Sequence, residues 1–140
     1  FKSNFLLNFL SKFSKEELEL KANEFVTSYE GHLKLGALKK IEDLKKNDNN
    51  EISIVSASLD IWIKPISDNL GINCIATLSN FDNNLFSGIK GENCWGEEKV
   101  ARIKKVYKLK NYNEIYVYGD SKGDFQMLKI ANHRRFKSFD

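Results

Sequence analysis

Three short apolar runs constrain the fold of this chain more than any other feature of its sequence. They are Ile52–Val55 (ISIV), Ile72–Ala76 (INCIA) and Glu114–Tyr118 (EIYVY). Runs of this length that are rich in β-branched and aromatic residues are typical of buried parallel strands. The amphipathic segments after the first and third runs, and Gly96–Leu109 before the third run, are predicted to be helices. The sequence therefore predicts an α/β fold, in which a parallel sheet carries helices on both of its faces.

Further helices are predicted before the first strand, and a hairpin after the second. Phe1–Phe13 has a hydrophobic stripe at helical spacing, and Ser14 with Glu17 has the capping-box pattern that begins a second helix. A third helix is predicted over Leu33–Lys46. Leu78–Ile89 is predicted to form a β-hairpin, because two apolar stretches flank a polar turn.

The composition fits one globular domain without a membrane span. The chain has 140 residues, of which 41% are hydrophobic and 29% are charged, which is enough to build a core. No apolar stretch reaches the roughly 18 residues that indicate a transmembrane helix. The first residue is Phe1 rather than Met, so we expect that the chain is a fragment or that its start has been removed.

Charge and cysteine content argue against nucleic acid as a partner and for a reducing compartment. Lys and Arg number 22 against 19 acidic residues, but only three of the 22 are Arg, the residue that phosphate-reading surfaces favour. Cys74 and Cys94 lie 20 positions apart without a CxxC motif, and we expect both to be free thiols. We therefore expect a cytoplasmic protein.

Polar clusters follow two of the predicted strands, at the edge where open α/β sheets bind ligands. Asp120 and Asp124 lie four positions apart in the segment Gly119–Asp124. Two carboxylates beside a phosphate are the oxygen donors that Mg²⁺ prefers. The alternative is that Asp120 and Ser121 only cap the following helix. The spacing by itself leaves both interpretations open.

Two further residues are candidates for holding a phosphate. Ser56 follows the first strand and precedes a helix, where a hydroxyl and backbone N–H groups suit a phosphate oxygen. A serine in this place is also a common helix cap. Lys99 is predicted in the first turn of a helix, where the helix dipole disfavours a cation unless an anion compensates. A solvated lysine is the alternative for this position.

In their order along the chain, these residues resemble the haloacid dehalogenase (HAD) superfamily. Ser56 after ISIV, Lys99 in CWGEEKVARI and the two aspartates of IYVYGDSKGDFQML look like motifs II, III and IV of its phosphoserine-phosphatase-like branch (subfamily IB). The resemblance implies a Rossmann-like sheet and a Mg²⁺-dependent hydrolase of small phosphomonoesters. It also implies that residues 1–32 are the remnant of a helical cap and that residues 33–140 form the core.

The resemblance implies a function for each matched residue. Ser56 and the backbone N–H of Ala57 would bind the phosphoryl group. Lys99 would neutralise the charge of that group and orient the nucleophile. Asp120 and Asp124 would hold Mg²⁺ directly or through water.

The chain departs from the family at motif I, an Asp-x-Asp pair that follows the first strand. No Asp precedes Asp43, and Asp43 lies inside a predicted helix. In the family, one motif I Asp becomes the aspartyl-phosphate and the other is the general acid and base. We expect this segment to lie upstream of Phe1. The sheet would then lack its first strand, the chain would contain no nucleophile, and the 140 residues would be inactive alone.

Two other function classes stay open at this point. One is a non-catalytic relative that binds phosphate or regulates without motif I, and the other is an interaction domain that uses the helix of Phe1–Phe13. Phosphoserine, other small phosphomonoesters and lipid-linked phosphates all fit as substrates, and the oligomeric state is open. Trp95, in the loop before Lys99, is a candidate for contact with the substrate, whereas Trp62 is predicted to pack in the core.

Overall fold

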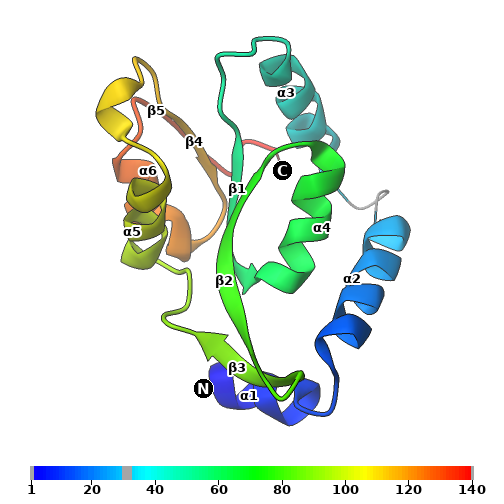
Figure 1. Cartoon of the computed structure of the whole chain (residues 1–140). Coiled ribbons are helices and arrows are strands. Elements are labelled where there is room, and N and C mark those ends of the chain that lie inside the picture. The colour runs from blue at the N-terminus through cyan, green and yellow to red at the C-terminus, as the bar shows by residue number, and fades with distance from the viewer. Residues whose placement is uncertain (1, 30–32, 140) are drawn as a thin grey trace.

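The computed structural model describes residues 2–29 and 33–139 of the chain. Its helices and strands alternate in most of the described sequence (Figure 1). The helices are α1 (Lys2–Leu10), α2 (Lys15–Tyr29), α3 (Leu35–Lys45), α4 (Asp60–Leu70), α5 (Glu97–Val106) and α6 (Phe125–Lys129), with short 3-10 helices η2 (Leu109–Asn111) and η3 (Lys122–Asp124). The strands are β1 (Ser53–Leu59), β2 (Asn73–Asp82), β3 (Leu85–Lys90), β4 (Tyr116–Gly119) and β5 (His133–Phe136).

The strands form two separate sheets with parallel pairs in each. β1 pairs with β2 in parallel, and β2 pairs with β3 in antiparallel orientation, so the first sheet has the order β1-β2-β3. β4 and β5 form the second sheet as a parallel pair. The α/β fold with parallel strands is therefore confirmed. Among the described strands none joins β1 to β4, so β1 and β4 each have one edge without a described partner strand.

The hairpin and one strand differ from their predicted bounds. The run INCIA and the first arm of the predicted hairpin form one continuous strand, β2, which leaves β1 and then pairs with β3. Asn83 and Asn84 take positive φ angles of 46° and 68° in the turn, as asparagine does in tight hairpins. β5 was not predicted, because His133–Phe136 carries three charged or titratable side chains and lies at a sheet edge.

Two hydrophobic clusters hold the elements together. The first lies between α5, α6 and the parallel strands and contains Ile75, Cys94, Ile103, Val117, Met127, Leu128 and Ala131. The second joins the N-terminal helices to α4 and the hairpin through Leu18, Leu59, Ile61 and Phe86. The described helices α1 and α2 therefore share a core with the α/β part. The predicted boundary at residues 32 and 33 touches residues 30–32, which lie outside the described residues.

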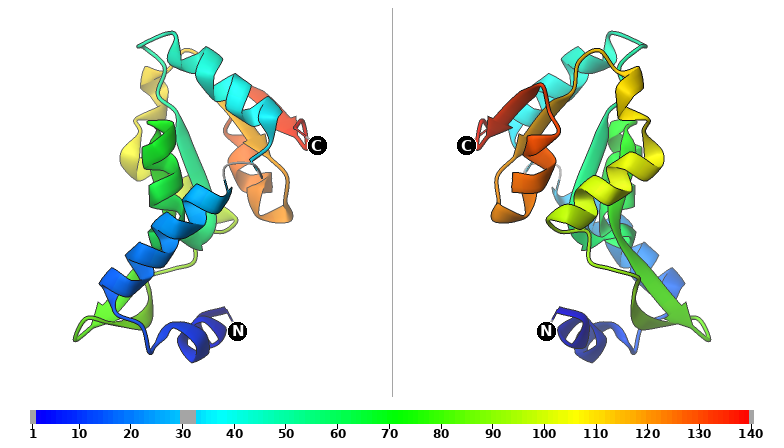
Figure 2. Two further views of the ribbon diagram at one scale, coloured as in Figure 1. Left: turned by 90° about the vertical axis from the view of Figure 1, so that its right-hand side faces the viewer. Right: turned by 90° about the vertical axis from the view of Figure 1, so that its left-hand side faces the viewer.

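The N-terminal helix lies at one end of the molecule. Figure 2 shows α1 beside the β2–β3 hairpin and away from α3 and the C-terminal strand. Side chains of Leu6, Leu7 and Leu10 pack on the second cluster, while Phe5 and Phe9 lie on the outside with their ring centroids 4.8 Å apart. Core packing therefore accounts for the leucines of this helix and leaves part of its hydrophobic stripe exposed.

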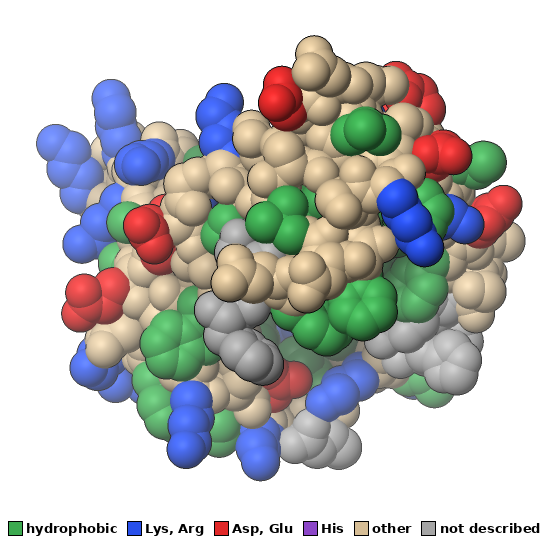
Figure 3. Space-filling view, turned by 90° about the horizontal axis from the view of Figure 1, so that it is seen from below, with side chains coloured by type: hydrophobic (Ala, Val, Ile, Leu, Met, Phe, Trp, Pro, Cys, Tyr) green, Lys and Arg blue, Asp and Glu red, His purple; other side chains and the backbone are tan. Residues whose placement is uncertain are grey.

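Charged side chains of both signs are spread over the surface seen from below (Figure 3). Hydrophobic side chains reach the surface between them, and basic side chains are most numerous at the left and bottom of this view. In the part of the chain that the structure describes, no helix has the length and apolar character to cross a bilayer.

Candidate functional site

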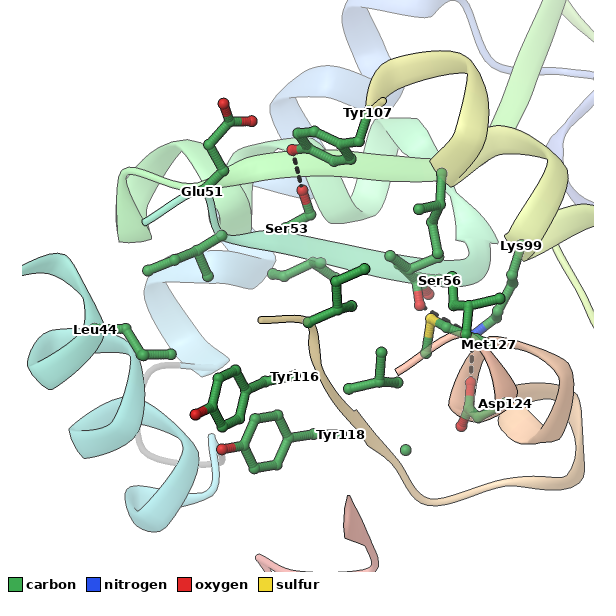
Figure 4. Close-up of a pocket in the computed structure, with 18 of the residues that line it drawn as sticks. Leu44, Glu51, Ser53, Ser56, Lys99, Tyr107, Tyr116, Tyr118, Asp124 and Met127 are labelled. Atoms are coloured by element: carbon green, nitrogen blue, oxygen red, sulfur yellow. Dashed lines mark hydrogen bonds and ion pairs between the residues drawn. The ribbon is translucent and has the colours of Figure 1, made fainter. Parts of the chain in front are cut away.

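A cavity of about 1050 Å³ lies between the open edges of β1 and β4. β1 contributes residues 53–58 to its lining, and β4 with the following turn contributes residues 116–121. In Figure 4, Ser56, Lys99 and Asp124 lie together at one end of this cavity, whereas Tyr116 and Tyr118 lie near Leu44 at the other end. The charged and hydroxyl groups predicted as a site therefore meet at one end of a hollow that the two sheets leave open.

Lys99 lies in the first turn of α5 and is buried. Its Nζ atom donates to the carbonyl oxygen of Val55 at 3.0 Å and to Oδ1 of Asp124 at 2.6 Å. The side chain is only 7% exposed, so the interpretation of a solvated lysine is wrong. An isolated ammonium is strongly disfavoured in the interior. The sequence predicted that an anion compensates a cation in the first turn of this helix, and in the structure that anion is Asp124.

Asp124 is held by groups from three directions. While Oδ1 pairs with Lys99, Oδ2 accepts the N–H of Asp120 at 3.1 Å and both the N–H and the hydroxyl of Ser121, at 3.0 and 2.9 Å. Burial by itself raises the pKa of this carboxyl. The Lys99 ammonium and the N–H groups of Ser121 and Asp120 outweigh burial, so the pKa of Asp124 lies below its ordinary value.

The close turn before Asp124 depends on a glycine. A Cβ atom at Gly119 would lie 2.6 Å from the Cβ atom of Asp124, a distance that real side chains do not adopt. Gly119 therefore lets β4 end directly against the aspartate that pairs with Lys99. The capping alternative is also partly right, because Ser121 begins η3 and forms a capping box with Asp124.

Ser56 and Ala57 lie where β1 changes its register with β2. The regular pairing runs to Ser56 and resumes only at Leu59, so the chain bulges between these two residues. Within the bulge, Oγ of Ser56 accepts the N–H of Ser58 at 3.1 Å, and its own hydroxyl proton can be donated to a ligand. Ser56 directly follows Val55, whose carbonyl accepts the hydrogen bond of Lys99, so the bulge begins next to the lysine.

Asp120 lies at the mouth of the cavity with its side chain exposed. Its carboxylate can reach a cation there, but both oxygens of Asp124 already have partners. Among the described residues, no group of three or more His, Cys, Asp or Glu side chains is placed to hold a metal ion. Mg²⁺ prefers six oxygen ligands, so the described residues do not form a magnesium site by themselves.

Thr77 is a part of this site that the sequence did not indicate. Its hydroxyl is fully buried, donates to the carbonyl oxygen of Ala57 at 2.9 Å and accepts the N–H of Cys94 at 2.9 Å. It thereby fixes the β1 bulge relative to the loop that leads into α5 and Lys99. In the sequence, a threonine inside an apolar run is indistinguishable from an ordinary strand residue.

Trp62 packs against the hydrophobic core, as the sequence predicted, and Trp95 lies at the cavity. Trp62 is partly buried and packs on the second hydrophobic cluster. Trp95 is 56% exposed and lines the cavity near Lys99.

Both cysteines are free thiols, as predicted, and burial raises the pKa values of Cys74 and Cys94.

Known proteins resemble this chain in sequence and in fold. A family model described as haloacid dehalogenase-like hydrolase matches residues 2–129. Protein CicA of Caulobacter vibrioides is 32% identical over 89 residues, which are 61% of this chain and 40% of CicA. The chain thus spans well under half the length of the curated relative that it matches.

Three solved structures share the fold at lower identity. A protein of unknown function from Bordetella pertussis Tohama I has a TM-score of 0.84 at 21% identity, over 94% of this chain and 62% of that one. A phosphoserine phosphohydrolase-like protein from Francisella tularensis has a TM-score of 0.64 at 23% identity, over 88% and 56%. Cytosolic 5'-nucleotidase IIIB bound to cytidine has a TM-score of 0.61 at 18% identity, over 89% and 45%.

Proposed function

Because the chain belongs to the haloacid dehalogenase-like hydrolase family, we propose that its cavity binds the phosphoryl group of a small phosphomonoester, which the whole protein hydrolyses. The observation that carries the proposal is the buried Lys99–Asp124 pair, whose lysine donates to the Val55 carbonyl next to the β1 bulge. A buried ion pair contributes little stability compared with hydrophobic side chains of the same size, so its presence beside a cavity favours a ligand-binding function.

In this proposal, three groups from this chain hold the phosphoryl oxygens. The Ser56 hydroxyl and the Ala57 N–H donate hydrogen bonds to them from the β1 bulge. The Lys99 ammonium neutralises their charge, while Asp124 and the Val55 carbonyl keep the ammonium in place. In a site shielded from water, such fixed charges and donors stabilise the transition state of phosphoryl transfer.

The nucleophile is proposed to come from a part of the protein outside these 140 residues. A carboxylate oxygen attacks phosphorus and forms an acyl phosphate. The bond between phosphorus and the oxygen of the leaving alcohol breaks, while an acid gives the alcohol oxygen a proton. Water then cleaves the acyl phosphate, which restores the carboxylate and releases inorganic phosphate. Asp43 does not supply this carboxylate in the structure, because it lies on α3 and pairs with Lys46 at 2.6 Å.

The proposal includes Mg²⁺, and Asp120 is the residue of this chain that would bind it. Its exposed carboxylate is the ligand that this chain would contribute, and the other oxygen donors would come with the missing carboxylate. Asp124 fits better as the partner of Lys99 than as a direct ligand, since its oxygens already accept four hydrogen bonds.

A phosphatase assay with a panel of small phosphomonoesters tests the proposal. We expect no turnover by the 140-residue chain and turnover by a longer product of the same gene. In the longer protein, Lys99→Met should lower kcat by about two to three orders of magnitude, as losses of charge-stabilising groups do. Lys104→Met, on an exposed position of the same helix, is the matched control and should keep the wild-type rate.

Each contrary outcome has a distinct meaning. Turnover by the 140 residues alone would show that the nucleophile lies within them. An unchanged rate in Lys99→Met would remove Lys99 from the site. Phosphate binding without turnover in every form of the protein would favour the non-catalytic phosphate-binding relative.

A further inference from the structure

We propose that Trp95 is a stacking platform for the leaving group, so that the site prefers phosphomonoesters with a planar ring next to the phosphate. This inference rests on the proposed function, because it assumes that the phosphoryl group binds near Lys99. It adds a class of substrate that the phosphate-holding residues do not determine.

The place of Trp95 in the cavity is the first argument. The residue comes directly before Gly96 and α5, and it lines the cavity together with Ser56, Lys99 and Asp120. Its indole contacts Gly123, the neighbour of the aspartate that pairs with Lys99. A ring joined to a phosphate near Lys99 would therefore extend toward the indole.

The way in which Trp95 is held is the second argument. A Cβ atom at Gly123 would lie 2.5 Å from Nε1 and 2.6 Å from Cδ1 of the indole, so one edge of the ring rests directly on the glycine backbone. The N–H of Gly96 donates to the carbonyl of Gly123 at 3.0 Å, and the N–H of Glu98 donates to the carbonyl of Trp95 at 3.2 Å. The backbone around the indole is thus tied to the turn that carries Asp124.

A fixed indole with a large exposed area suits a flat ligand. Trp95 is 56% exposed although its indole contacts Gly123 at one edge, so much of the residue's surface is accessible from the cavity or solvent. Stacking on a ring that is already ordered requires little further loss of side-chain entropy. Aromatic pairs gain a further attraction from offset or edge-to-face contact, which an aliphatic leaving group cannot provide.

Nuclear magnetic resonance on the 140-residue chain tests this inference without any need for turnover. The chain has two tryptophans, so it gives two indole N–H signals, and Trp62→Phe identifies the signal of Trp95. The probes are inorganic phosphate, glycerol 3-phosphate and phenyl phosphate, which share the charged group and differ in the attached part. The signal of Trp62, which lies in the second hydrophobic cluster, is an internal control.

We expect all three probes to shift the amide signals of Ala57 and Lys99, and phenyl phosphate to bind about five- to tenfold more tightly than glycerol 3-phosphate. Only phenyl phosphate should move the Trp95 indole signal strongly. Trp95→Ala should abolish the preference for phenyl phosphate while the affinity for inorganic phosphate stays within twofold. Trp95→Phe should restore part of the preference, because it keeps a ring in the same place.

The outcomes separate this inference from the proposed function. If inorganic phosphate binds at Ala57 and Lys99 but phenyl phosphate gains nothing over glycerol 3-phosphate, the stacking inference is wrong and the proposed function stands. If Trp95→Ala keeps the full preference, the ring is recognised elsewhere and the inference is again wrong. If inorganic phosphate binds neither the 140-residue chain nor the longer protein in the presence of Mg²⁺, both proposals are overturned.

Discussion

Lys99 and Asp124 form an ion pair of which each side chain is only 7% exposed. The Val55 carbonyl and the turn at Asp120 and Ser121 supply the remaining hydrogen bonds. Removing one partner from such a pair leaves an uncompensated charge in the interior, which is more harmful than replacing both by apolar groups. The stability of this part of the fold therefore depends on the presence of both charges.

The depressed pKa of Asp124 predicts a loss of stability in acid. The folded state binds the proton less readily than the unfolded state, so this carboxylate stabilises the fold above its ordinary pKa and stops doing so as the pH falls through the lower, folded value. We expect Asp124→Asn to lower the free energy of unfolding at pH 7 by about 3–5 kcal/mol. It should also weaken the dependence of that free energy on pH below about 4.

Urea denaturation at a series of pH values measures both effects. Asp68→Asn is the matched control, because Asp68 pairs with Lys64 at the surface, where ion pairs contribute about 0–1 kcal/mol. If Asp124→Asn and Asp68→Asn cost the same at pH 7, the burial of the Lys99–Asp124 pair has no energetic consequence in solution.

The capping box at the start of α2 is an element-scale feature that the sequence predicted correctly. The N–H of Ser14 donates to Oε2 of Glu17 at 2.8 Å, and the N–H of Glu17 donates to Oγ of Ser14 at 3.2 Å. The same segment touches the hairpin, since Ser14 forms an isolated bridge with Leu85. The cap therefore fixes where α2 begins relative to β3.

Ser14→Ala should lower the free energy of unfolding by about 1 kcal/mol, because the N–H of Glu17 loses the Ser14 hydroxyl that accepts its hydrogen bond. Thermal or urea unfolding followed by circular dichroism measures this change. Ser11→Ala, at an exposed position in the turn before the cap, should change the stability by less than about 0.5 kcal/mol. Equal effects of the two substitutions would contradict the capping argument.

At the scale of the whole molecule, the division into two sheets determines which strands are well protected from amide hydrogen exchange. β2 pairs with β1 along its first half and with β3 along its second half, whereas β4 has only β5, and β1 and β4 each turn one edge to the cavity. A two-stranded sheet is marginal without further packing, which here comes from α6 and the first cluster.

Amide hydrogen exchange should reflect this division. We expect the amides of β2 to exchange most slowly and those of β4 and β5 at least about tenfold faster, because opening a terminal strand pair requires less than global unfolding. Exchange followed by nuclear magnetic resonance gives the rate at each position. Uniform protection across both sheets would show that the open edges do not weaken the β4–β5 pair.

The sequence by itself determined the alternation of helices and strands, the cap at Ser14 and the identity of the chemical groups. These depend on local patterns of hydrophobicity, turn residues and short motifs, which a chain of residues carries in its order. The continuous course of β2 was not predictable, because a strand that leaves one partner and takes another shows no break in its sequence. β5 was missed because its charged residues lie on an exposed edge.

Only the tertiary structure decided which groups meet. Lys99 and Asp124 are 25 positions apart, and no local pattern shows that one neutralises the other. The buried hydroxyl of Thr77 and the contact between the Trp95 indole and Gly123 also join separate segments. Such contacts follow from the packing of α5 against α6 and β2, where the free energy of a charge or a hydroxyl depends on which neighbours replace water.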